Sequence, residues 1–375
     1  MKVPRLKYIL SIAALCLLLP GCNDRLNLED ASLPLALGMD LNEKQKFQFY
    51  ISAPIFSKDI KKKSREVSGT AKSLRESRAK QDAQLPGSVH GRNFQVIVIG
   101  KRMLQHNDWF PMLDVIYRDS RNTISDRMIM ADGRVADIIY VNSPDQPAVP
   151  VFLRGLIDSG AARGETVKTT AMDLHRQFFD KGMTPFISEI KLRPDNKITL
   201  KGTALLTRRG KYAASLNFQE TVLLLILRDE VKRGMTLSYT IPIEPRQGPF
   251  ATDRLSFSLG KTGAAIQTAY KEGRFHFRIK VKSTINISEE QFQRSVWNRS
   301  EELARNIEKK MKEDFERLLR KCQQSQVDPV GFGIYARAFE YPHFKKVQDQ
   351  WGKELSRAAF DVDVRVKIES MGPIK

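Results

Sequence analysis

The sequence predicts a multi-domain mixed fold. An N-terminal α/β domain is expected first, then a C-terminal α+β domain with an antiparallel sheet and a long packed helix. Two patterns predict it. Up to about residue 195, short apolar strand-like runs alternate with segments of helical periodicity. From residue 196, strand-like runs follow one another, and one long amphipathic segment precedes a last alternating strand. We expect domains at residues 22–195 and 196–375, with a subdivision near residue 235 left open.

The N-terminal elements are predicted in chain order. Strands at residues 31–41 and 47–56 flank a turn at 42–45, and a polar helical segment covers residues 68–84. The run Phe94-Gln-Val-Ile-Val-Ile-Gly100 is typical of a strand buried on both faces. The remaining elements are a helix at 109–117, a strand at 128–130, and helices at 149–157 and 170–179. Gly182 is expected to end the last helix as a C-terminal glycine.

The C-terminal half is predicted to begin with strands. Residues 197–206 and 211–216 indicate a hairpin around Arg208, Arg209 and Gly210. A meander should follow, with strands at 255–259, 264–269 and 274–285 and a hairpin turn from Gly260 to Gly263. The third of these strands alternates cleanly, with Phe275, Phe277, Ile279 and Val281 on one face and His276, Arg278, Lys280 and Lys282 on the other.

A long amphipathic helix and a last strand complete this half. Ser288 with Gln291 predicts a capping box that opens the helix. The apolar stripe of the helix consists of Phe292, Val296, Leu303, Ile307, Met311, Phe315, Leu318 and Cys322. Apolar and charged residues alternate over residues 360–368, so Val362, Val364 and Val366 should face the helix. The apolar run 222–227 suits a buried helix or strand and is too short to span a bilayer.

The N-terminus predicts a lipoprotein signal peptide at residues 1–21. Lys2, Arg5 and Lys7 precede an apolar run at residues 9–19, and Leu19-Pro20-Gly21-Cys22 reads as a lipobox. Cys22 would then be the first mature residue, and its nucleophilic sulfur would carry a diacylglycerol. A plain signal peptide with an accidental cysteine, or an uncleaved anchor, is the alternative.

Charge is the second strong feature. The formal net charge is +19, and removal of residues 1–21 leaves +16. An exported chain is not expected to bind nucleic acid, whereas a basic protein beside anionic lipid gains roughly 1 kcal/mol per nearby cation. The run Lys61-Lys62-Lys63 is either a solvated loop or a contact for lipid headgroups or an acidic partner. Cys322 has no expected partner and should be a buried, inert thiol.

Enzyme chemistry finds no support in the sequence. The five histidines are scattered, without Cys, Asp or a second His at metal-ligand spacing. No Gly-x-Ser-x-Gly motif occurs, and Gly260-Lys261-Thr262 lacks the first glycine of a phosphate loop, since that position is Leu255. The sequence therefore predicts a non-enzymatic protein without a metal or other cofactor.

Ordered motifs along the chain carry a resemblance to one family. The segment after the lipobox, Cys22-Asn23-Asp24-Arg25, and the later Ala36-Leu-Gly-Met-Asp40 resemble the opening of the Ger(x)C spore germination lipoproteins. Further matches are Leu28, Asp30, Val96 to Gly100, Arg118-Asp119, Gly202-Thr203-Ala204, Glu220, Asp328, Gly331-Phe332-Gly333, Pro342, Trp351 and Gly372. The chain departs from the family pattern at Asn23, where a Trp is usual, and at Leu206, where Phe is usual.

The resemblance implies a location more sharply than a mechanism. Ger(x)C proteins are C subunits of nutrient germinant receptors, held on the outer face of the spore inner membrane beside A-type and B-type membrane subunits. It implies lipid attachment at Cys22 and no catalytic residue. The other matched residues are expected to be structural: Asp24, Gly202, Glu220, Asp328, Gly331, Phe332, Gly333 and Trp351.

Two rival classes are weighed against this interpretation. A lipid-anchored solute-binding protein would also begin with a lipobox, but it normally has two similar halves around a cleft, and the halves here differ in pattern. A cell-wall hydrolase would need a catalytic constellation, which the sequence does not supply.

Overall fold

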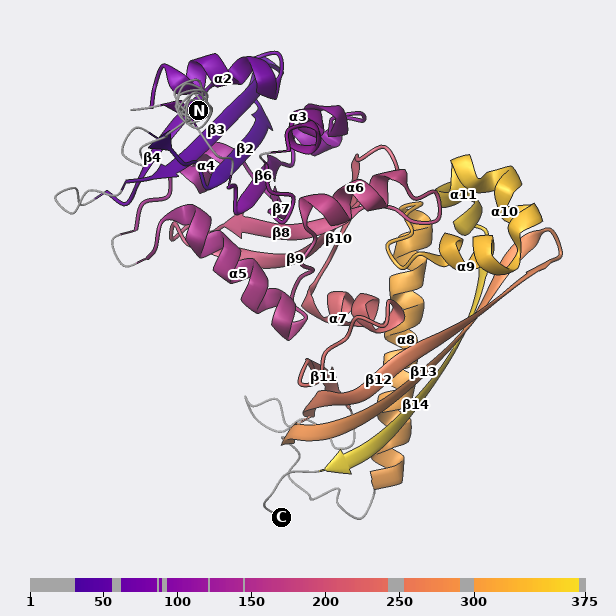
Figure 1. Cartoon of the computed structure of the whole chain (residues 1–375). Helices are drawn as coiled ribbons and strands as arrows, with labels where there is room; N and C mark the ends of the chain where they lie inside the picture. Colours follow the sequence, from indigo (N-terminus) through magenta and orange to yellow (C-terminus); the bar gives the residue numbers. More distant parts are fainter. Residues whose placement is uncertain are drawn as a thin grey trace, which may run out of the picture.

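The computed structural model describes residues 31–55, 62–85, 88–89, 93–120, 122–143, 146–241, 253–290 and 300–370. It shows a mixed α/β protein with two main sheets (Figure 1). The indigo-to-magenta N-terminal part and the orange-to-yellow C-terminal part lie at opposite ends of the molecule, and helix α7 (Phe218–Leu227) lies between them. The predicted multi-domain mixed architecture is confirmed.

The N-terminal sheet has eight strands in the order β10-β9-β8-β7-β6-β2-β3-β4. The central pairs β2–β6, β6–β7 and β7–β8 are parallel, and the outer strands are antiparallel. The strands are β2 (Ala36–Leu41), β3 (Phe47–Pro54), β4 (Ser64–Thr70), β6 (Val96–Gly100), β7 (Arg127–Ala131), β8 (Phe186–Leu192), β9 (Ile198–Leu206) and β10 (Tyr212–Leu216). A separate parallel pair joins β1 (Ala31–Ser32) to β5 (Ser88–Val89).

Both faces of this sheet are buried, as the apolar run at residues 96–100 predicts. Ile97 and Ile99 face one core and Val96 and Val98 face another. The first core is covered by α2 (Leu74–Asp82), η2 (Met103–Gln105), η3 (Phe110–Leu113), α3 (Asp114–Arg118) and α6 (Ala171–Phe179). The second is covered by α4 (Val135–Ile139) and α5 (Val149–Arg163). The apolar run at residues 96–100 is thus an inner strand of the sheet, buried on both faces.

Two local predictions in this half are wrong. The polar segment at 68–84 is not one helix: it contains the end of edge strand β4, and α2 begins only at Leu74. An edge strand with a wet face can be polar, so the pattern resembled a solvated helix. Gly182 does not end α6, whose C-cap is Asp180. Its lack of a side chain has another reason, because a Cβ there would lie 2.7 Å from the backbone of Gly333.

The hairpin at 197–216 forms as predicted, but it extends the first sheet. Strand β9 pairs with β8 and β10 pairs with β9, so the sheet continues across residues 195 and 196. Helix α7 follows and is apolar on nearly every side. It is capped by Asn217, whose side chain accepts from the Glu220 backbone N–H at 2.9 Å. This confirms the buried element expected at 222–227.

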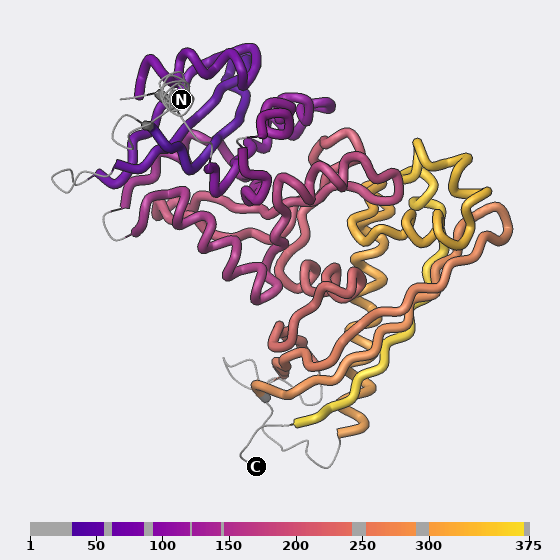
Figure 2. Tube along the Cα trace, viewed as in Figure 1, coloured from indigo at the N-terminus to yellow at the C-terminus, as the bar shows by residue number. Residues whose placement is uncertain are grey.

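The C-terminal sheet has four strands in the order β11-β12-β13-β14. They are β11 (Thr236–Thr240), β12 (Arg254–Lys271), β13 (Arg274–Glu290) and β14 (Ala359–Ser370). Figure 2 shows the long orange hairpin and the yellow last strand running side by side. The sheet is not purely antiparallel as expected, because β14 pairs with β13 in parallel. The intervening helices carry the chain back to the starting end of β13, which is what a parallel pair requires.

The predicted meander is also wrong in its first turn. Residues 255–259 and 264–269 belong to one strand, β12, whose register shifts between Leu259 and Thr262. Gly260 lies at this bulge, where an added Cβ would be 2.4 Å from Thr284 Oγ1 on the neighbouring strand. The hairpin turn instead lies at Glu272 and Gly273, both with positive φ. Close approach to Thr284, and not a turn, explains the glycine at position 260.

Helix α8 (Ser300–Gln324) packs on one face of this sheet. Its buried stripe agrees with the predicted stripe from Leu303 to Cys322, and burial raises the pKa of the Cys322 thiol. Ser288 lies in β13 and does not cap the helix, while Gln291, Phe292 and Val296 are outside the described residues. Short helices follow: α9 (Phe332–Phe339), α10 (Tyr341–Val347), η5 (Gln348–Gln350) and α11 (Trp351–Leu355).

The last strand has the predicted register. Val362, Val364 and Val366 are buried in the core that α8 covers. At the free edge of β14, the backbone N–H of Val366 donates to Glu308 Oε1 of α8 at 2.9 Å. The helix therefore both covers the sheet and satisfies part of its edge.

Candidate functional site

The expected lipid-attachment residue, Cys22, and the matched residue Asp24 lie outside the described residues. Within the described ranges, no helix is both long and apolar enough to cross a membrane. In the same ranges, no three His, Cys, Asp or Glu side chains come together in a way that could hold a metal ion. The sites that can be built are polar clusters of three kinds.

The first cluster brings together five of the matched residues around the buried carboxylate of Asp328. Its Oδ1 accepts from the Gly331 backbone N–H at 2.7 Å, and its Oδ2 accepts from Gly333 N–H at 2.9 Å and Trp351 Nε1 at 2.7 Å. Complete burial raises the pKa of this carboxyl, against the lowering effect of the donors. Phe332, the fifth member, packs between Phe277 and Phe360.

Local conformation makes this arrangement possible. Gly331 has φ of 92°, so the chain turns in the left-handed region immediately before α9. The Asp328 carboxylate thereby reaches the free N–H groups at the start of α9, where negative charge is stabilised. A Cβ on Gly333 would lie 2.7 Å from Gly182 and from the Trp351 indole nitrogen. Both matched glycines are thus required by geometry.

The same cluster joins the two ends of the molecule. The Thr184 backbone N–H donates to the Asp328 carbonyl at 2.9 Å, and the Asp328 N–H donates to Thr184 Oγ1 at 2.8 Å. Arg228, which follows α7, donates to the Pro329 carbonyl at 2.7 Å and lies over the Phe186 ring. We call these contacts the Asp328 junction. No local pattern in the sequence marks Thr184 or Arg228, and Gly182 packs against Gly333 here in place of its expected role at a helix end.

The remaining matched residues also have structural positions. Gly202 in β9 has φ of 139°, and a Cβ there would lie 1.9 Å from the Leu216 carbonyl oxygen. Glu220 closes the capping box of α7, accepting from Asn217 N–H at 2.9 Å, and it forms an ion pair with Lys321 of α8. Glu220 therefore ties the central helix to the long C-terminal helix.

The second cluster lies at the carboxyl ends of the parallel strands, where α/β sheets commonly bind ligands. Asp132, after β7, contacts Lys101 Nζ at 2.7 Å and Lys201 Nζ at 2.6 Å. Lys201 also contacts buried Glu189 Oε1 at 2.8 Å. Asp40, at the end of β2, accepts from the Leu41 and Val135 backbone N–H groups at 2.8 and 3.1 Å.

This second cluster is closed by its own charges. Partial burial would raise the pKa of Asp132, but hydrogen bonds from Lys101 and Lys201 outweigh it and lower the pKa. The same contacts raise the pKa of Lys201. Each carboxylate here already has a cation or backbone donors, so the cluster is suited to fixing the strand ends. Lys101 and Asp132 each directly follow an apolar strand, and this is the sequence signal that could have located the cluster.

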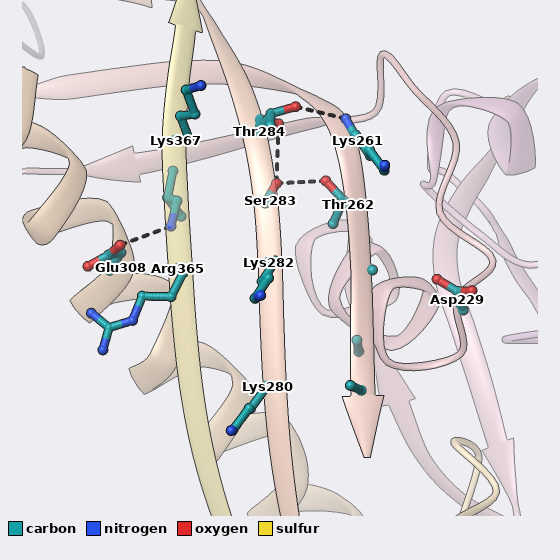
Figure 3. Close-up of a pocket in the computed structure, with 14 residues that line it drawn as sticks. Asp229, Lys261, Thr262, Lys280, Lys282, Ser283, Thr284, Glu308, Arg365 and Lys367 are labelled. Carbon is teal, nitrogen blue, oxygen red and sulfur yellow. Dashed lines mark hydrogen bonds between the residues drawn. The ribbon is translucent and has the colours of Figure 1, made fainter. Parts of the chain in front are cut away.

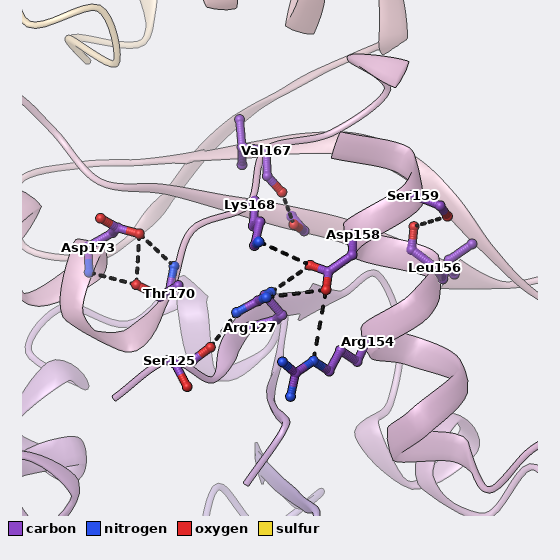
Figure 4. Close-up of polar contacts among 11 residues, drawn as sticks. Ser125, Arg127, Arg154, Leu156, Asp158, Ser159, Val167, Lys168, Thr170 and Asp173 are labelled. Carbon is purple, nitrogen blue, oxygen red and sulfur yellow. Dashed lines mark hydrogen bonds and ion pairs between the residues drawn. The ribbon is translucent and has the colours of Figure 1, made fainter. Parts of the chain in front are cut away.

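The third cluster fixes α5 against the sheet (Figure 4). Buried Arg127 of β7 binds Asp158 of α5 through two contacts of 2.7 and 3.2 Å, and Arg154 and Lys168 approach the same carboxylate at 3.8 and 3.9 Å. Although partial burial opposes it, Arg127 lowers the pKa of Asp158. Next to it, burial raises the pKa of Asp126 to about 7.

Both halves of the chain match models of protein families. Residues 24–192 match the family model described as the spore germination protein N-terminal domain. Residues 201–372 match the model described as spore germination B3/GerAC like, C-terminal. The two models occur in this order and together cover nearly all of the chain.

Individual relatives agree. YfkR of Bacillus subtilis (strain 168), named as a proposed spore germination protein, is 21% identical over 345 residues, covering 85% of this chain and 84% of YfkR. The spore germination protein YndF of the same organism is 22% identical over 322 residues, covering 82% of this chain and 75% of YndF. The crystal structure of the GerBC protein shares the fold, with a TM-score of 0.57, 17% identity, and coverage of 89% of this chain and 96% of that one. The chain therefore belongs to the Ger(x)C family of spore germination proteins, as its motifs predict.

Proposed function

We propose that this protein is a lipid-anchored, non-enzymatic C subunit of a spore nutrient germinant receptor. The observation that carries the proposal is the ordered match of both spore germination family models over residues 24–192 and 201–372. The polar clusters support a non-enzymatic role. The carboxylates of Asp328, Asp132 and Asp158 are engaged by the protein's own donors and cations.

The proposed anchor is a diacylglycerol on Cys22, which would place the protein on the outer face of the spore inner membrane. Eight residues, and so nine Cα-to-Cα steps, separate Cys22 from Ala31, where the described structure begins. Fully extended, such a segment reaches roughly 30 Å. The folded part would therefore stay within a thin layer above the bilayer, where weak contacts with membrane partners become effectively intramolecular.

The proposed partners are the A-type and B-type integral-membrane subunits, and no nucleic acid is involved. In this arrangement the protein supplies contact surface and a rigid body. The Asp328 junction and the Glu220–Lys321 ion pair, which hold the two ends of the molecule together, support rigidity.

Co-purification tests the proposal directly. The protein, tagged at its C-terminus, would be isolated from detergent-solubilised spore membranes, and an A-type and a B-type subunit should be recovered with it. Deletion of the gene should weaken germination on particular nutrients and leave nutrient-independent germination intact. Recovery of no integral-membrane partner, together with tight nutrient binding by the isolated protein, would overturn the proposal in favour of a lipid-anchored solute-binding protein.

The anchor needs its own test. Cys22→Ala should abolish incorporation of radiolabelled fatty acid and release the protein from the membrane fraction. Its free energy of unfolding should not change, because Cys22 precedes every residue of the three described cores. Continued fatty-acid incorporation into Cys22→Ala would show that the lipid is attached elsewhere.

A further inference from the structure

The outer face of the C-terminal sheet carries a basic hollow that none of the clusters above includes, and Glu308 of α8 reaches it at the free edge of β14. A cavity of about 830 Å³ spans β12, β13 and β14. Its long side chains are five cations and two carboxylates, an excess of three positive charges. We call it the basic trough; its cations are Lys261, Lys280, Lys282, Arg365 and Lys367, and its carboxylates are Asp229 and Glu308.

The sheet geometry places these cations together. Lys280 and Lys282 follow one another on the outer face of β13, with Arg365 and Lys367 on β14 and Lys261 on β12 (Figure 3). All five are exposed. On β12 the lining includes two small residues, Gly263 and Ala265, and a Cβ at Gly263 would lie 3.1 Å from Asp229 Oδ1.

The carboxylates near the trough neutralise it only in part, and Asp363 lies beside Lys280 in the strand register. Arg365 has a carboxylate partner, Asp363, at 3.5 Å. Among the described residues, no carboxylate lies within 4.0 Å of the ammonium groups of Lys261, Lys282 or Lys367. In the strand register, Lys282 lies directly beside Arg365. Like charges side by side on one face of a sheet repel each other, so the pairing of Lys282 with Arg365 does not stabilise the fold.

We propose that the basic trough binds the anionic headgroups of a phospholipid bilayer, as a contact separate from the lipid on Cys22. Charge complementarity supports this occupant, since each Lys or Arg near an anionic leaflet contributes roughly 1 kcal/mol. The lining argues against an acidic protein segment. Its one larger aliphatic side chain, Val366, is buried, and protein interfaces usually contain aromatic anchors and few lysines at their centre.

The inference rests on the proposed location at a membrane, but its test is independent of the anchor. The chain from residue 23 onward, which contains both matched family segments, would be made without lipid. Its co-sedimentation would be measured with phosphatidylglycerol-containing vesicles and with pure phosphatidylcholine vesicles. We expect binding to the first and not the second, with the binding weakening as salt is raised.

Two double variants locate the contact. Lys282→Glu with Lys367→Glu reverses two trough charges, and Lys345→Glu with Lys346→Glu makes the same charge change at exposed positions on α10. The trough variant should lower the vesicle partition coefficient roughly 30-fold or more, because two near-surface cations are lost. The α10 variant should stay near the parent. Equal losses in both variants would overturn the proposal, because binding would then follow net charge alone.

Folding and ligand identity are checked in the same samples. Lys282→Glu places a carboxylate beside Arg365, so the trough variant should unfold at no lower urea concentration than the parent. If it does not fold, Lys282→Gln with Lys367→Gln replaces it. Displacement from vesicles by inorganic phosphate, but not by chloride at equal ionic strength, would indicate a free-anion site and overturn the proposal. Trough-dependent binding to polyglutamate without vesicle binding would overturn it in favour of an acidic protein partner.

Discussion

Asp328→Asn should destabilise the protein more than its small chemical change suggests. The native carboxylate accepts from three N–H donors, and it is completely buried. Asparagine has one acceptor oxygen and places an NH₂ group where the other oxygen was. Either the Gly331 N–H, or both the Gly333 N–H and Trp351 Nε1, must then face another donor.

The size of the destabilisation follows from the number of buried N–H donors that lose their acceptor. A hydrogen bond to a charged group contributes about 1.5–3 kcal/mol, and a buried donor without an acceptor costs about 1–3 kcal/mol. We therefore expect Asp328→Asn to lower the free energy of unfolding by about 3–5 kcal/mol. That is a large share of the ~5–15 kcal/mol typical of a folded protein.

Urea unfolding of the chain from residue 23, followed by tryptophan fluorescence and circular dichroism, measures the effect. Asp195→Asn is the matched control, because Asp195 is exposed and pairs with Arg193 at 3.3 Å on the surface. Such a pair contributes about 0–1 kcal/mol. If Asp328→Asn unfolds within about 1 kcal/mol of the parent, the Asp328 junction does not have the energetic role assigned to it.

A double-mutant cycle sharpens the test. Trp351→Phe removes one donor and leaves Asp328 with its two backbone donors, so on its own it should cost about 1.5–3 kcal/mol. In the double variant, Trp351→Phe also removes an N–H donor for which the amide at position 328 has no acceptor oxygen to offer. The loss of unfolding free energy in the double variant should therefore be smaller than the sum of the two single losses, by about 1 kcal/mol or more. Additive costs would mean that the two side chains do not act through the hydrogen bond seen between them.

Three further predictions concern other parts of the fold, each read from urea unfolding. Val364→Asp should cost several kcal/mol, since it buries an unpaired charge, and wild-type stability would show that β14 has another register. Gly202→Ala should strongly destabilise the protein, because its Cβ would lie 1.9 Å from the Leu216 carbonyl oxygen. Gly155→Ala is the control: a Cβ there has open space around it, so this variant should be as stable as the parent or more stable. Equal destabilisation in the two variants would contradict the strain argument. Asp126 has a folded pKa of about 7, above its unfolded value, so its stabilising contribution is complete below about pH 4 and is lost as pH rises to about 7. Asp126→Asn should therefore flatten that part of the pH–stability curve, and an unchanged slope would contradict the assignment.

Elements with a complete periodic pattern could be predicted from the sequence. The apolar run 96–100 became a central strand, and the alternation at 274–282 gave the correct two faces of β13. The stripe of α8 and the inward valines of β14 follow from the same rule, because burial repeats every 3.6 residues in a helix and every second residue in a strand.

What failed depends on contacts between distant segments. The polar edge strand β4, the bulge at Gly260 and the parallel pairing of β14 are all set by a neighbouring strand, and no local periodicity records that neighbour. The Asp328 junction is similar. The resemblance marks Asp328 and its matched neighbours, but their contact residue Thr184 is 144 positions away in the sequence, so no local pattern predicts the contact.

The domain boundary near residue 195 stays a prediction, and a boundary there would separate strands that pair in one sheet. The two family models meet between residues 192 and 201, yet β9, which begins at Ile198, pairs with β8, and β10 pairs with β9. A C-terminal fragment beginning at residue 196 would carry this hairpin without its sheet and would leave the β8 edge of the other fragment unpaired, a state prone to aggregation. Helix α7 and the Asp328 junction then connect the hairpin to the core between α8 and the C-terminal sheet. The N-terminal sheet is therefore joined to the C-terminal sheet through packed and hydrogen-bonded elements, so a cut at residue 195 would disrupt both parts of the molecule.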